Sequence, residues 1–66
     1  MNRADQIKLA WKENKPAMYK ELKKAGKLNE LADRDGAEMQ RRIDDLVVSG
    51  MFDVEAFEIV AEDFLR

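Results

Sequence analysis

The stretch DGAEMQRRIDDLVVSG, residues 35–50, decides how this chain folds. Asp35, with Glu38 three residues later, resembles a capping box in which Asp replaces Ser or Thr, and such a pair starts a helix. Gly50 then supplies a helix stop. Between these signals the apolar residues recur at helical spacing, namely Met39, Ile43, Leu46 and Val47. The stretch therefore predicts an amphipathic helix over residues 36–48, around which the rest of the chain must be arranged.

Helix signals continue on both sides of this stretch. Asn2 is a favourable cap for a first helix. Pro16 either ends that helix or begins a second one, which should run to about Ala25 before a stop at Gly26. Asp53 is the predicted cap of a last helix. The apolar stripe of that last helix consists of Val54, Phe57, Ala61, Phe64 and Leu65. No strand pattern competes with these helices.

Residues 28–48 allow two interpretations. In the first, a short helix over 28–32 is followed by an interruption at Asp33–Gly36 and then by the helix described above. In the second, one long helix passes through the interruption, because apolar or small residues keep helical spacing throughout. These residues are Leu28, Ala32, Gly36, Met39 and Ile43. A glycine inside a helix costs about 1 kcal/mol relative to alanine, which favours the break.

Together, these signals predict a single all-α domain over residues 1–66. It should be a small bundle of four to five short helices with short connections. A chain of this size buries only about 60% of its unfolded surface, so packing or self-association must reinforce it. We expect the core to hold Trp11, Tyr19, Leu22, Leu31, Met39, Ile43, Leu46, Phe57, Val60 and Phe64. The apolar residues exceed what this core can hold. The surplus predicts a partner surface that comprises Met51, Phe52 and Ile59.

The composition argues against catalysis. The 66 residues include no Cys and no His, which removes the commonest nucleophile–base pairs and the commonest metal ligands. The only serine, Ser49, follows a predicted helix end. Asp33 and Asp35 resemble the start of a calcium loop, but the glycine that such a loop requires at its sixth position is Glu38 here. We expect no enzyme, no metal, no cofactor and no small-molecule substrate.

No apolar run approaches the roughly 20 residues that span a bilayer. The first ten residues, MNRADQIKLA, lack the apolar core of a signal peptide. The sequence predicts a soluble, cytoplasmic protein with no membrane partner.

Charge divides the chain into two parts. Residues 1–27 carry eight Lys or Arg against three Asp or Glu, whereas residues 28–66 carry four against eleven. The two parts of the chain either attract each other within the fold or simply solvate separate faces. Alternatively, they offer a basic face to an acidic partner and an acidic face to a basic one.

A DNA-binding reading rests on residues 28–52. A short helix, a turn and a capped helix with Arg41 and Arg42 resemble helix-turn-helix regulators, whose recognition helix contacts phosphates or base edges. Acidic residues in the same helix, such as Asp44, count against this reading. The candidate nucleic-acid surface consists of Lys8, Lys12, Lys15, Lys20, Lys23, Lys24, Lys27, Arg41 and Arg42.

Scattered residues over about positions 8–62 carry a second resemblance. In the first half they are Lys12-Glu13, Lys15-Pro16, Tyr19, Leu22, Gly26-Lys27-Leu28 and Leu31-Ala32-Asp33. In the second half they are Arg42, Leu46-Val47, Glu58-Ile59-Val60 and Glu62. Together they resemble the transposon-encoded TnpV family, although the connection before Glu58 is shorter here. The resemblance implies an accessory protein of a mobile element, or an excisionase-like architectural role on DNA, and it transfers no functional residue.

Two functional hypotheses follow. The first is a small helical interaction module of a mobile element that binds another protein or itself through apolar residues outside the core. The second is a compact helix-turn-helix-like accessory factor that binds DNA. The orientation of Arg41 and Arg42 separates them, because a surface continuous with the lysines favours DNA, whereas pairing with nearby carboxylates favours protein binding.

Overall fold

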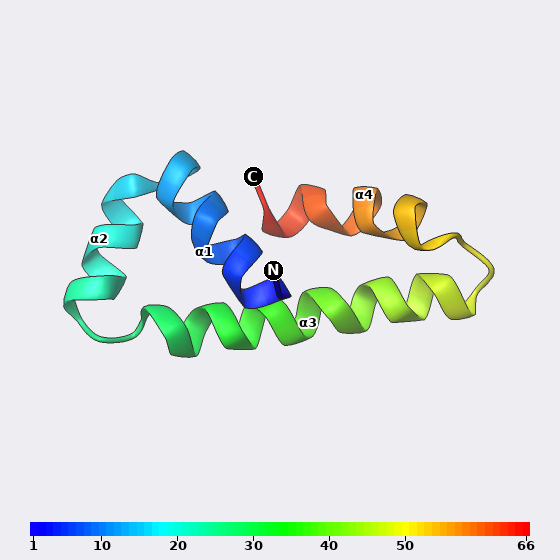
Figure 1. Cartoon of the computed structure of the whole chain (residues 1–66), viewed down its shortest axis with the longest axis horizontal. Coiled ribbons are helices and arrows are strands. Elements are labelled where there is room, and N and C mark those ends of the chain that lie inside the picture. The colour runs from blue at the N-terminus through cyan, green and yellow to red at the C-terminus, as the bar shows by residue number, and fades with distance from the viewer.

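A computed structural model describes residues 1–66 and contains four α-helices and no strand (Figure 1). They are α1 (Arg3–Asn14), α2 (Pro16–Lys24), α3 (Leu28–Val48) and α4 (Asp53–Phe64). The all-α prediction is confirmed, and the number of helices lies within the predicted range. None of the four helices combines the length and the apolar character needed to cross a lipid bilayer.

Helix α3 is the axis of the molecule. It follows the long dimension of a chain that measures 41 × 19 × 17 Å (Figure 1). Helix α1 packs against its middle, α4 runs back along its C-terminal half, and α2 lies at the end where α3 begins. The α2–α3 turn and the α3–α4 turn therefore lie at opposite ends of the molecule.

The predicted break at Asp33–Gly36 is wrong, because α3 is continuous over its 21 residues. Gly36 is buried where α1 crosses α3, and a Cβ atom there would lie 2.9 Å from the backbone nitrogen of Ala4 and 3.2 Å from its Cα. The glycine allows two helix backbones to touch, so packing offsets its intrinsic cost in a helix. The continuous helix agrees with the second interpretation of residues 28–48, in which Gly36 belongs to the apolar face of one long helix.

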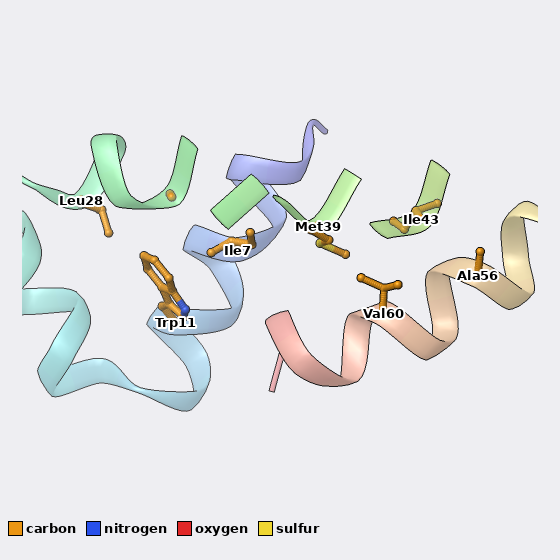
Figure 2. Packing of buried hydrophobic residues seen from close by; sticks show 8 residues of the cluster. Ile7, Trp11, Leu28, Met39, Ile43, Ala56 and Val60 are labelled. Carbon is orange, nitrogen blue, oxygen red and sulfur yellow. The ribbon is translucent and has the colours of Figure 1, made fainter. Parts of the chain in front are cut away.

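Eight apolar residues form the buried core. Figure 2 shows Met39 and Ile43 of α3 facing Val60 and Ala56 of α4, while Trp11 of α1 points toward Leu28. The predicted core residues Trp11, Met39, Ile43 and Val60 are buried, and Ile7, Leu28, Ala32 and Ala56 complete the set. The other predicted core residues are only partly buried and pack against this cluster: Tyr19, Leu22, Leu31, Leu46, Phe57 and Phe64.

Both predicted glycine stops are confirmed. Gly26 and Gly50 have φ angles of 72° and 112°, which glycine adopts without steric cost. At the second stop the backbone N–H of Met51 donates to the carbonyl of Leu46 at 3.0 Å, which closes a Schellman-type end. Asn2 also caps α1 as predicted, since its Oδ1 accepts from the backbone N–H of Asp5 at 2.8 Å.

The predicted cap of the last helix is wrong by one residue. Phe52 occupies the N-cap position in extended conformation, and no side chain caps this end. Asp53 lies inside the first turn, where its charge still favours the positive end of the helix dipole. Phe52 is thus the last residue of the α3–α4 connection, and its side chain lies largely in solvent.

Candidate functional site

Six large apolar side chains are exposed. Four of them lie on the hairpin formed by α3 and α4, while Leu9 lies on α1 and Met1 precedes it. Val48, Phe52, Val54 and Ile59 are exposed by 88, 78, 69 and 52%. Of the predicted partner surface, Phe52 and Ile59 are exposed, while Met51 is partly buried against the core. We call the exposed set, Val48, Phe52, Val54 and Ile59, the hairpin surface.

Two hollows adjoin the hairpin surface. Ile59 lines a groove of about 300 Å³ with Leu46 and Val60, and the rim of this groove carries Arg41, Arg42, Asp45 and Asp63. Val54 lines a separate hollow with Phe57 and Arg3. An apolar floor with a charged rim is typical of a protein-binding surface.

Sequence reasoning did not identify Val48 as part of this surface. Val48 follows Ile43 by five residues, which is about 140° around the helix from the buried side, since each residue advances by about 100°. That angle was readable from the sequence. Helical spacing alone therefore places Val48 away from the buried side of α3.

Arg41 and Arg42 pair with carboxylates. The Arg41 guanidinium lies 2.6 Å from Glu38 and 3.0 Å from Asp45, whereas Arg42 lies 3.2 Å from Glu38 and 3.4 Å from Asp63 of α4. These hydrogen bonds to Arg41 and Arg42 lower the pKa of Glu38 from 4.5 to about 2. Both arginines are thus engaged with the acidic hairpin.

The turn required by the helix-turn-helix prediction is absent. Residues 33–36 are helical within α3, so no separate recognition helix begins at Gly36. The arginines predicted to lie on that helix contact carboxylates of α3 and α4 instead of extending the lysine surface.

Six of the predicted nucleic-acid-surface lysines have no carboxylate within ion-pair distance. They are Lys12, Lys15, Lys20, Lys23, Lys24 and Lys27. All six are exposed and lie on the C-terminal part of α1, in the α1–α2 connection, on α2 and in the α2–α3 turn. Lys8 differs, because its Nζ lies 3.5 Å from Asp5 and donates to Asn29 at 3.1 Å. We call the six lysines the basic end.

The basic end has its own hollow. A cavity of about 320 Å³ opens between α1, α2 and the start of α3, and its lining includes Tyr19 and Leu28 between Lys8 and Lys23. Glu13, Glu21 and Glu30 share this end of the molecule, which leaves lysines in excess.

The outward carboxylates of α4 make the hairpin acidic. Asp53, Glu55 and Glu58 form no ion pair within the chain. Glu58 lies one turn after Val54, and Glu55 lies one turn before Ile59, so each exposed apolar residue of α4 has a carboxylate on its own face. Basic and acidic surfaces thus occupy opposite ends of a 41 Å molecule (Figure 1).

No cluster of three metal-ligating side chains is present. Ser49 donates its hydroxyl to the carbonyl of Leu46 at 2.7 Å, which is a helix-end contact. Comparisons with protein-family models, with curated proteins and with solved structures found no match to this chain.

Proposed function

We propose that this chain is a small helical protein-interaction module that binds its partner through the hairpin surface. The observation that carries the proposal is the exposure of Val48 and Phe52, at 88 and 78%, in a chain with only eight buried apolar residues. A soluble monomer gains nothing from such side chains in water, whereas a partner that covers them gains about 25 cal/mol for each Å² of apolar area buried.

Charge narrows the class of partner. The exposed apolar residues of α4 alternate with Glu55 and Glu58, which have no partner within the chain. Opposite charge across an interface steers association and rejects wrong partners. The proposed partner therefore presents basic side chains around an apolar patch.

The proposal includes a role as an accessory protein of a mobile element, with no enzymatic activity. Its support is the resemblance of residues such as Lys15-Pro16, Gly26-Lys27-Leu28 and Glu58-Ile59-Val60 to the TnpV family. This part of the proposal predicts that the natural partner is a product of the same element, either another protein or a second copy of this chain.

Affinity capture with a matched pair of variants tests the proposal. We expect Phe52→Ser/Ile59→Ser to reduce recovery of the natural partner from host extracts by about tenfold or more, because central apolar contacts dominate binding energy. The control, Asp33→Ser/Arg34→Ser, changes two exposed residues of α3 outside the hairpin surface and the basic end, and should retain the partner. Both variants should keep their stability within about 1 kcal/mol in chemical denaturation. Equal recovery by wild type and the apolar variant would contradict the proposal.

Nucleic-acid binding is the second candidate function, and one observation favours it. The six lysines of the basic end are exposed and free of intramolecular ion pairs, as phosphate contacts require. We expect a DNA mobility shift at about 20 mM salt that weakens steeply as salt is added. Absence of a shift at the low salt concentration would eliminate this candidate.

A further inference from the structure

We infer that the hairpin surface binds the basic end of a second copy of this chain, so that two copies pair side by side and antiparallel. The inference rests on the proposed function and names the partner. It starts from the fact that one chain carries both halves of a complementary pair of surfaces.

Charge decides the orientation. Two copies that met hairpin to hairpin would bring Asp53, Glu55 and Glu58 against their own counterparts, and like charges across an interface are repulsive. An antiparallel pair instead places these carboxylates beside the lysines of α2, of which Lys20 and Lys24 lie one turn apart. A two-fold axis makes the favourable contact twice.

The area that an interface needs determines how far the two copies overlap. A standard protein interface buries about 800 Å² on each partner. The long side of the molecule, 41 Å by 19 Å, covers roughly 780 Å², whereas an end of 19 Å by 17 Å covers roughly 320 Å², well below that size. Only pairing along the whole length reaches the area of a stable interface.

Pairing of two copies along their whole length also places the exposed Phe52 of one copy against the other copy. The α3–α4 turn and the α2–α3 turn lie at opposite ends of the molecule (Figure 1), so an antiparallel pair brings Phe52 of one copy next to the turn at Gly26 of the other. Gly26 lines the hollow of about 320 Å³ together with the partly buried Tyr19 and the buried Leu28. We expect an aromatic side chain there to contact Tyr19 and to lie beside Lys8 and Lys23, which line the same hollow.

Sedimentation equilibrium of the whole chain tests the pairing. We expect a dimer at about 100–500 µM protein, with a dissociation constant that rises about tenfold between low and high salt as the charges are screened. Lys20→Glu/Lys24→Glu and Glu55→Lys/Glu58→Lys should each be monomeric, because both ends then carry the same sign of charge. An equimolar mixture of the two variants should form a heterodimer, because every contact is again between opposite charges.

Two controls separate specific pairing from general attraction between oppositely charged proteins. Adding Phe52→Ser to both charge variants should abolish the heterodimer, while unspecific attraction would survive it. The chain lacks cysteine, so Ser49→Cys and Ala25→Cys introduce single thiols at the two turns. Oxidation of the mixed thiols should give the cross-link between positions 49 and 25 in preference to the one between two copies of position 49.

The outcomes distinguish this inference from the proposed function. A wild-type chain that stays monomeric at about 500 µM in low salt, or a cross-link that joins two copies of position 49, overturns the antiparallel pair. The proposed function survives that result if the apolar variant still loses a separate captured protein. If the hairpin variants change neither self-association nor capture, both fail.

Discussion

The crossing of α1 over α3 and the hairpin of α3 with α4 bury apolar surface to different extents. At the crossing, Gly36 lets the backbones meet, and Ile7 and Ala32 are fully buried. On the hairpin, Ala56 and Val60 are buried, yet Phe52 stays 78% exposed. The chain thus buries the apolar residues of the α1–α3 crossing with its own side chains, but it leaves apolar side chains exposed on the α3–α4 hairpin. This difference supports a hairpin that is completed by a partner.

The largest expected effect comes from a pair of isoleucines that differ in burial. Ile43 is 3% exposed in the core, whereas Ile59 is 52% exposed on the hairpin surface. Ile43→Ala should lower the free energy of unfolding by about 2–5 kcal/mol, and Ile59→Ala by less than about 1 kcal/mol. Urea denaturation of both variants measures the two losses. Similar losses at the two positions would show that the hairpin surface belongs to the core.

The next effect tests the crossing itself. Gly36→Ala gains about 1 kcal/mol of helix propensity, but its Cβ meets the backbone of Ala4 at 2.9 Å, so α1 must shift. We expect a net loss of about 1–3 kcal/mol, the usual cost of overpacking.

The matched control for the crossing is Ala37→Gly, one residue along and exposed. It should cost about 1 kcal/mol through helix propensity alone. The control thus reports the intrinsic effect of glycine in α3, and the two variants together isolate the steric term. If Gly36→Ala raised the free energy of unfolding, the close approach of the two helices would be refuted.

The smallest effect concerns the ion pairs beside the hairpin. The folded-state pKa of Glu38, about 2, lies below its ordinary value of 4.5. The stability contributed by the charged form is therefore complete above about pH 4.5 and is lost as the pH falls toward 2. Glu38→Gln removes this contribution, so its thermal midpoint should fall less than that of the wild type across this pH window. Parallel curves for the two proteins would contradict the assigned ion pairs.

Local signals predicted most of the helix ends. Asn2 and Gly50 act through hydrogen bonds and dihedral angles of a few neighbouring residues. Their effects can therefore be predicted from the local sequence. The predicted orientation test also has a clear result, since Arg41 and Arg42 reach carboxylates three or four residues away on the same helix.

Contacts between distant segments were not predictable in the same way. Gly36 is read as a helix breaker by its intrinsic preference, and only the arrival of α1 at Ala4 explains why α3 continues. The burial of Ile7 instead of Tyr19 has the same origin, because α1 crosses the middle of α3 while α2 contacts only its beginning. The hairpin surface could not be predicted in full, because the sequence does not show which face of α4 the other helices leave uncovered.

The continuity of α3 also has a thermodynamic consequence. One helix carries both the residues that hold α1 and the residues that hold α4, so neither end can unfold without disturbing the helix on which the other depends. A ligand that binds only the folded hairpin adds its binding free energy to the stability of the native state. Such a ligand should therefore slow amide hydrogen exchange in the lysine-rich helices as well, at a distance from any contact it makes.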